Sequence, residues 1–366
     1  MIALPTTTAR LAGSFAGAFL AVAACARAQS TVTLPCDRDA TLYESATGSI
    51  ADGSGPGLFV GVTGQPMARR ALVRFDLAQL PAGARVLGAT VTTTSTNSAS
   101  PTPLDSGWHR VLSDWAEGPT VAGGNGGGGG PAQSGDVTWL HRDYTSVLWN
   151  SPGGDYVATP SFSMPLQAVG SSTSTLDAGL VADVQSWVDN PAGNFGWLVR
   201  ADETQVSTAT RLSSRESGNG FQLQVTYLAP GAVGAWSAGC LVSQPSGTQL
   251  PMSLQLTGHA SGGATIGLGY TSCPPSSVGA TFFALGLEYG PAGLGVPLPG
   301  LACAVHLPLA GLVPGNVWLT SAQGAASDTF AVPANAPGFL ITCQGAAVDA
   351  TPFGASLSNA GAMLTQ

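Results

Sequence analysis

Apolar and polar residues alternate along several short segments of this chain, and this pattern constrains the fold more than any other feature. Between Arg70 and Asp76, the apolar residues Ala71, Val73 and Phe75 occupy every second position, and the same period recurs in residues 221–227. A period of two places successive side chains on opposite faces of a β-strand. The pattern therefore predicts half-buried strands.

Other segments are rich in β-branched and aromatic residues and are bounded by turn residues, which is also typical of strands. They are residues 86–96, 108–112, 156–166, 196–200 and 209–213, and, in the last third, 252–256, 265–269, 282–287, 317–320 and 339–343. The glycine run 123–130 predicts a mobile loop tip.

One helix is predicted over residues 176–188. Its apolar residues share one face, Asp177 can cap its start, and Asn190 with Pro191 ends it. The apolar face consists of Leu180, Val181, Val184, Trp187 and Val188.

The chemistry of the chain changes after Arg215, the last positively charged residue. Beyond Ser217 the only charged side chains are the carboxylates of Glu288, Asp328 and Asp349. With a boundary at residues 228–231, we expect one domain over residues 31–228 and a second over 232–366. The predicted fold class is all-β: a jelly-roll-like β-sandwich with one short helix, followed by a smaller Gly/Ala-rich, cysteine-containing β domain.

The first 28 residues predict an export signal and thus a secreted or cell-surface location. Arg10 precedes an apolar run of about 14 residues, short of the roughly 20 that span a bilayer. The run leads into Ala26-Arg27-Ala28, a small-x-small cleavage pattern. The alternative is a lipoprotein anchored through Cys25, which follows a lipobox-like Val-Ala-Ala. No later segment reaches transmembrane length without interruption.

The charge of the chain argues against nucleic acids as partners. The chain has 12 positively charged side chains, all Arg, against 20 carboxylates. Nucleic acids need a basic footprint that this balance does not supply. Only 9% of residues are charged while 44% are hydrophobic, so burial of apolar surface can order the chain.

Five cysteines remain after removal of the predicted export signal, and export makes disulfides possible for them. Four of these five lie in the last third, where two bridges are expected and three pairings are open. They are Cys240, Cys273, Cys303 and Cys343, and Cys36 is left over. No Cys/His spacing predicts zinc.

Several motifs follow one another along the first domain. They are DATLYE at 39–44, RALVRFDL at 70–77, LPAGA at 80–84, HRVLSDW at 109–115, VQSWVDNP at 184–191, NFGWLV at 194–199 and SRE at 214–216. In this order they resemble the DNRLRE domain family of exported proteins, which is similar to a family of carbohydrate-binding modules. The resemblance covers residues of about 37–228 and implies a jelly-roll-like sandwich in an extracellular setting, and it implies glycan binding only loosely.

Aromatic residues are the candidate ligand-binding groups, because sugar rings stack on flat aromatic faces. Trp139, Tyr144 and Trp149 lie in a turn-rich stretch and are candidates for a stacking platform, together with Trp115. The competing interpretation places these rings in the core, where large aromatics usually lie. We expect the partner to be a polysaccharide or an envelope glycan.

Acidic residues near Asp37 and Asp39 raise a second possibility, because oxygen-rich loops of exported sandwiches bind calcium. Turn and cap chemistry is the favoured interpretation of these residues. We therefore expect no cofactor, with a structural calcium ion at Asp37 and Asp39 as the alternative.

The sequence contains no recognisable catalytic motif, and we expect a non-catalytic surface or carbohydrate-binding module. No G-x-S-x-G, H-E-x-x-H, Walker-A or dinucleotide fingerprint occurs. The alternatives are a structural envelope or matrix protein without a small ligand and a polysaccharide-active enzyme. Asp114 with Glu117 is the nearest local pair of carboxylates for the enzyme.

Overall fold

In the described residues, the regular secondary structure is mostly antiparallel β-strand, with a single α-helix, as predicted. The computed structural model describes residues 29–290, 293–297, 299, 303–350 and 354–366. The predicted export signal and Cys25 lie outside the described residues. No helix of the described part is long and apolar enough to cross a membrane.

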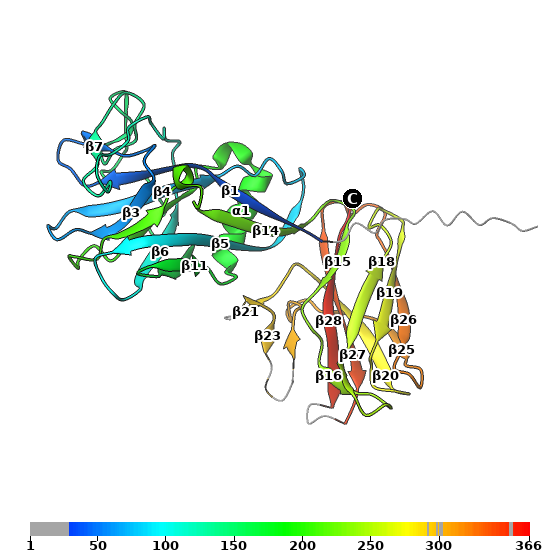
Figure 1. The fold of residues 1–366 in the computed structure, drawn as a ribbon. Helices are drawn as coiled ribbons and strands as arrows, with labels where there is room; N and C mark the ends of the chain where they lie inside the picture. The colour runs from blue at the N-terminus through cyan, green and yellow to red at the C-terminus, as the bar shows by residue number, and fades with distance from the viewer. Residues whose placement is uncertain (1–28, 291–292, 298, 300–302, 351–353) are drawn as a thin grey trace, which may run out of the picture.

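Two sets of strands lie one after the other along the chain (Figure 1). We call them the N-terminal unit (Ser30–Leu228) and the C-terminal unit (Val233–Gln366). The N-terminal unit holds β1 (Ser30–Tyr43), β2 (Ile50–Ala51), β3 (Gly57–Val62), β4 (Ala68–Phe75), β5 (Arg85–Ser98), β6 (Leu104–Arg110), β7 (Gly130–Pro131), β8 (His141–Asp143), β9 (Val147–Leu148), β10 (Phe162–Leu166), β11 (Gly170–Thr173), α1 (Ala178–Asp189), β12 (Trp197–Ala201), β13 (Thr210–Ser213) and β14 (Gln222–Leu228), with short 3-10 turns at Pro191–Gly193 and Arg215–Ser217.

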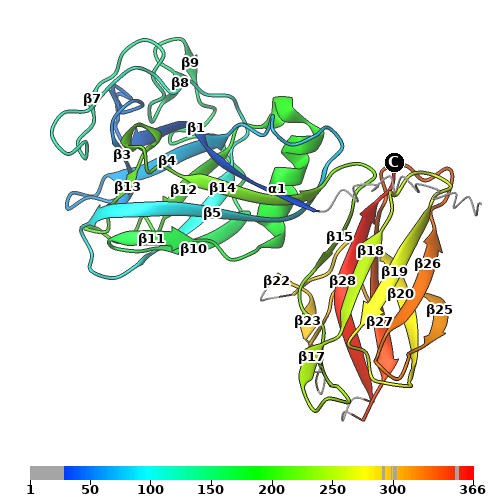
Figure 2. The ribbon, with the colours of Figure 1, turned by 45° about the vertical axis from the view of Figure 1, so that its right-hand side comes forward.

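The C-terminal unit holds β15 (Val233–Trp236), β16 (Leu241–Ser243), β17 (Gln249–Pro251), β18 (Ser253–Thr257), β19 (Thr265–Thr271), β20 (Val278–Leu285), β21 (Tyr289–Gly290), β22 (Gly293–Leu294), β23 (Val296–Pro297), β24 (Ala304–Val305), β25 (Val313–Leu319), β26 (Ala326–Ala331), β27 (Leu340–Val348) and β28 (Ala355–Leu364). Figure 2 shows both units turned, with the start of β1 and the end of β14 near the start of β15.

Strand β1 joins the two sheets of the N-terminal unit. Its first half pairs with β14, and after an irregularity at Cys36 its second half pairs with β4. Sheet A contains β11, β5, β14 and β13, and sheet B contains β4, β12, β6 and β10, with β1 and β3 contributing to both. The bulge turns the strand, so that one continuous segment crosses from one layer to the other.

Aromatic rings fill the space between sheets A and B. Trp197 of β12 contacts Trp108 of β6 at 6.1 Å between ring centroids and Trp187 of α1 at 4.5 Å. The helix begins after Asp177, whose Oδ1 accepts hydrogen bonds from the backbone N–H groups of Gly179 and Leu180. The predicted helix and its cap are therefore confirmed.

A carboxylate on α1 secures this packing. The Oδ2 atom of Asp183 accepts a hydrogen bond from Trp197 Nε1 at 2.8 Å and another from Ser161. Arg110 lies 3.7 Å from its Oδ1 atom. A buried indole N–H needs such an acceptor.

The outer face of sheet B is covered as well. The segment between Val111 and Tyr156 folds over it and forms a second apolar cluster with Leu42, Leu72 and Leu198. Strand β4 is consequently buried on both faces, although its alternation predicts one exposed face. Within the glycine run, Gly126 is buried and its carbonyl oxygen accepts a hydrogen bond from the Tyr43 hydroxyl at 2.7 Å, whereas Gly123, Gly124 and Gly128 are exposed.

The C-terminal unit is a second sandwich. A five-stranded sheet in the order β15-β28-β27-β20-β25 faces a three-stranded sheet in the order β18-β19-β26. Tyr270 and Trp318 stack between them at 4.6 Å. Glycines make room for these rings, because a Cβ at Gly345 would lie 2.3 Å from Tyr270 and one at Gly279 would lie 2.1 Å from Trp318.

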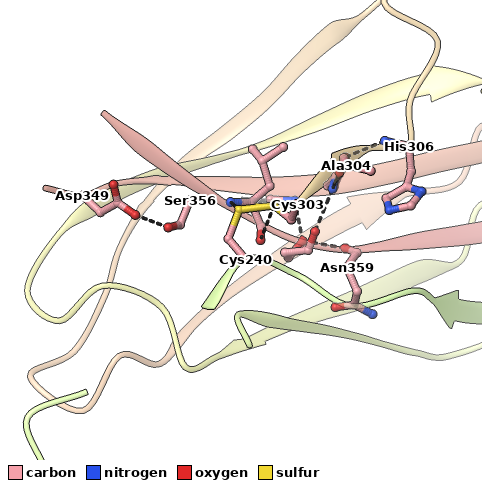
Figure 3. The surroundings of a disulfide bond; sticks show 11 residues. Cys240, Cys303, Ala304, His306, Asp349, Ser356 and Asn359 are labelled. Atoms are coloured by element: carbon pink, nitrogen blue, oxygen red, sulfur yellow. Dashed lines mark hydrogen bonds between the residues drawn. A yellow bond between two sulfur atoms is a disulfide. The ribbon is translucent and has the colours of Figure 1, made fainter. Parts of the chain in front are cut away.

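One disulfide, Cys240–Cys303, ties the segment between β15 and β16 to the segment before β24, beside Ser356 and Asn359 of β28 (Figure 3). Of the two bridges expected in the last third, only this one forms among the described residues. Cys273 and Cys343 are free thiols within the apolar core, and Cys36 is a free thiol in the N-terminal unit. Burial raises the pKa values of the Cys273 and Cys343 thiols, to about 11 and about 12.

We expect Asp183→Ala to lower the free energy of unfolding of the N-terminal unit by about 1–3 kcal/mol, because it leaves the buried Trp197 N–H without an acceptor. Chemical denaturation followed by near-ultraviolet circular dichroism measures the change. Asp189→Ala on the exposed end of the same helix is the matched control. Equal stability of the two variants would contradict this assignment.

The disulfide closes a segment with a sequence separation of 63. We expect Cys240→Ala/Cys303→Ala to destabilise the C-terminal unit by about 4 kcal/mol, because the unfolded chain regains the entropy of that loop. Amide hydrogen exchange in β15 and β28 reports the loss, and a thiol reductant should reproduce it in the unaltered protein. Unchanged protection in both experiments would show that the bridge is dispensable.

Candidate functional site

The three tryptophan rings predicted to form a stacking platform are buried, so the prediction that they bind a sugar is wrong. Trp115, Trp139 and Trp149 are only 2%, 8% and 6% exposed. The indole N–H groups of Trp115 and Trp149 donate to the carbonyl oxygens of Phe195 and Thr138 at 2.9 and 3.0 Å. These contacts are typical of structural rings and leave no ring face for a sugar.

The covering segment explains the burial of these rings. All three belong to the cluster packed on the outer face of sheet B. The Arg70 guanidinium lies over the Trp139 ring, 4.6 Å from its centroid. Tyr144 is half-buried and meets the His141 ring edge-on at 5.0 Å.

The structure does not bring Asp37 and Asp39 together as calcium ligands. Asp37 is ion-paired with Arg74, whereas Asp39 is buried and accepts a hydrogen bond from the backbone N–H of Arg215 at 2.8 Å. Within the described ranges, no group of three or more His, Cys, Asp or Glu side chains is placed to hold a metal ion.

Asp39 has an unusual environment for a carboxylate. Its Oδ1 atom has no hydrogen-bond partner among the described residues. Burial, together with the negative charges of Glu216 and Glu117, raises its pKa to about 7, although the Arg215 N–H opposes the shift. The folded protein therefore binds a proton at Asp39 more tightly than the unfolded chain does.

The local carboxylate pair, Asp114 and Glu117, is engaged by arginines. Arg38 contacts Asp114 at 2.9 Å, and Arg215 contacts Glu117 at 2.8 Å. Glu117 also accepts a hydrogen bond from the backbone N–H of Asp39 at 2.8 Å. The two carboxylates thus take part in separate structural contacts.

A cleft lies where the two units meet. Near it, Leu87 and Leu228 of the N-terminal unit pack with Leu340 and Leu364 of the C-terminal unit. The cleft has a volume of about 400 Å³, within the range of about 300–1,000 Å³ that is typical of ligand pockets. We call it the junction cleft; its lining residues are Gln29, Leu87, Gly88, Ala89, Thr90, Leu176, Gln224, Thr226, Trp236 and Ser237.

The register of sheet A builds one wall of the junction cleft. Thr90 lies opposite Gln224 and Gly88 lies opposite Thr226 on the paired strands β5 and β14. Paired residues on opposite strands project to the same face, so hydroxyl and amide groups line this wall beside the gap at Gly88. Leu176, which precedes α1, adds an apolar surface.

Trp236 at the end of β15 contributes an aromatic ring from the other unit. Unlike the rings considered from the sequence, this half-buried ring lines a cavity. Trp236 Nε1 and Gln29 Oε1, a donor and an acceptor, have no hydrogen-bond partner among the described residues. No charged side chain lines the cleft.

No protein-family model matches the chain, and no curated protein matches it either.

We expect Asp39→Asn to alter how stability depends on pH. The raised pKa of Asp39 stabilises the fold at low pH, and this contribution is lost as the pH rises from about 4 through about 7. The neutral amide does not ionise, so the variant should not show this loss. Its free energy of unfolding should therefore rise by on the order of a few kcal/mol relative to that of the unaltered protein between pH 4 and pH 8.

Urea denaturation over this pH range measures the difference. The exposed Asp76→Asn is the control, because its side chain still accepts the Ala78 N–H. Parallel pH profiles for the Asp39→Asn variant and the unaltered protein would contradict the assignment.

Proposed function

We propose that this protein is an exported, non-catalytic module that binds an uncharged saccharide in the junction cleft. The observation that carries the proposal is the Trp236 ring, which shares an uncharged cleft with the hydroxyl and amide groups of Thr90, Gln224 and Thr226. The C–H face of a sugar packs on an aromatic ring while its hydroxyls bond to polar groups around the ring.

The absence of charge in the cleft lining favours a neutral sugar. A uronate or a sulfated sugar would lose hydration on entry without meeting a cation. A sugar hydroxyl both donates and accepts, so it suits the mixed hydroxyl and amide wall.

Two further observations support the extracellular part of the proposal. The Cys240–Cys303 bridge is of a kind that persists in oxidising compartments. The motifs between residues 37 and 228 resemble the DNRLRE domain family, whose members are exported, and the all-β fold agrees with that resemblance.

Two substitutions test the cleft in different ways. Trp236→Ala removes the ring, and Gly88→Val adds a branched side chain to the wall without removing any group. The first atom that a Cβ at Gly88 meets is Leu176 Cδ1, at 3.2 Å, and valine favours a strand. We expect each variant to bind a neutral polysaccharide at least tenfold more weakly, about 1.4 kcal/mol.

Affinity electrophoresis against a panel of neutral polysaccharides identifies a ligand, and titration calorimetry with its oligomers measures the affinities. Trp236→Phe should retain part of the affinity, because it keeps an aromatic face. Thr92→Val is the matched control, since Thr92 is the next outward-facing residue of β5 and lies outside the cleft. Retained binding by both Trp236→Ala and Gly88→Val, or no binding by the unaltered protein, would refute the proposal.

A further inference from the structure

A second groove lies on the outer face of sheet B, where the covering segment does not reach. Strands β6 and β12 pair with Gly107 opposite Arg200, and both residues face away from the core that holds Trp108 and Val199. Gly107 has no side chain and forms part of a groove of about 360 Å³. A Cβ there would lie 2.9 Å from His109 Nε2. We call this the Gly107 groove; its polar lining includes Asp105, His109, Arg200, Asp202 and Glu203.

One wall of the Gly107 groove is built in advance by ion pairs. Arg70 holds both carboxylate oxygens of Glu203, at 2.6 and 2.8 Å. Arg200 contacts Glu203 at 2.8 Å and donates to the Tyr156 hydroxyl at 2.9 Å. Because Glu203 binds both guanidinium groups, Arg200 is already engaged before any ligand arrives.

The other two carboxylates of the groove, Asp105 and Asp202, form no ion pair within the described part of the chain. Asp105 and Asp202 continue the strand register one position beyond the pair Ser106–Ala201, and both are exposed. Neither forms an ion pair with a described residue. Asp202 only accepts hydrogen bonds from its neighbour Thr204, at 2.9 and 2.7 Å.

His109 adds a neutral acceptor. The residue is only 5% exposed, and its Nδ1 atom lies 2.9 Å from the carbonyl oxygen of Val157. That contact requires the proton on Nδ1 and leaves Nε2, beside Gly107, as an acceptor. Burial, assisted by the charges of Arg200 and Arg70, lowers the pKa of His109 and keeps the ring neutral at pH 7.

We propose that the Gly107 groove binds the primary ammonium group of an amino sugar, as in a glycan with free glucosamine units. An ammonium group has three donors, and Asp105, Asp202 and His109 Nε2 are three acceptors at one groove. Arg70 and Arg200 together balance Glu203 and one further negative charge, so the three carboxylates leave the site with one net negative charge, which attracts a cation and repels uronates.

No side chain of the protein supplies a competing ligand of this kind. The sequence contains no lysine, so a second copy cannot offer a lysine ammonium group to the groove. The Gly107 groove and the junction cleft also share no lining residue. The two proposals can therefore fail independently.

The test is titration calorimetry with glucosamine hexamer and with its fully N-acetylated form. Acetylation removes the charge, so we expect the acetylated hexamer to bind at least tenfold more weakly. Asp105→Asn/Asp202→Asn should weaken glucosamine binding at least tenfold and leave thermal stability unchanged, because the new amide oxygen at position 202 can still accept from Thr204. Asp76→Asn, which removes a carboxylate outside the groove, should stay within twofold of the unaltered protein, as should Trp236→Ala.

Any of the following outcomes would overturn the proposal. Equal binding of the two hexamers shows that the charge is not recognised, and no binding of either shows that the groove is not a site for amino sugars. Unchanged binding by Asp105→Asn/Asp202→Asn places the ligand elsewhere. Calcium that binds alone and displaces the hexamer identifies a divalent-cation site, and binding of a lysine-rich peptide but not of the hexamer identifies a protein partner.

Discussion

The packing of three indole rings, one of them hydrogen-bonded to a buried carboxylate, organises the N-terminal unit. Trp108, Trp187 and Trp197 come from β6, α1 and β12, and Asp183 on the helix accepts the hydrogen bond of Trp197. This cluster fixes the helix against the sandwich and sets which side of each strand faces inward. Since β6 and β12 turn their indoles into the core, the alternate residues must face outward, and those residues line the Gly107 groove.

Local signals in the sequence predicted the parts of the fold that depend on local physics. The helix and its Asp177 cap follow from the apolar period and one side-chain oxygen, and strand β14 shows the alternation of a strand with one solvated face. Strand β4 shows the same alternation but is buried on both faces. A segment that follows much later in the chain covers it, and the burial of Trp139 and Trp149 has the same cause. Alternation reports the two faces of a strand but not what later packs on them.

The junction cleft has no sequence signature for a comparable reason. Its lining combines β5, β14 and β15 with the turn before α1, and only the packing of the two units brings Trp236 near Gly88. One signal was available: Trp236 follows the predicted boundary at residues 228–231 and lies in the part of the chain without cations, which begins after Arg215. An aromatic residue at such a boundary deserves weight as a site residue, because ligand pockets favour junctions between folded units.

The uneven distribution of charge then separates the two candidate sites by chemistry. All the arginines of the described chain lie in the N-terminal unit, and there they hold the carboxylates Asp37, Glu117 and Glu203 in ion pairs. Asp105 and Asp202 remain outside these pairs and give the Gly107 groove its negative charge. Where the charge-poor C-terminal unit meets sheet A, no charged side chain lines the cleft between them. The two candidate sites lie on different sheets and differ in charge, so each would recognise its own class of sugar independently of the other.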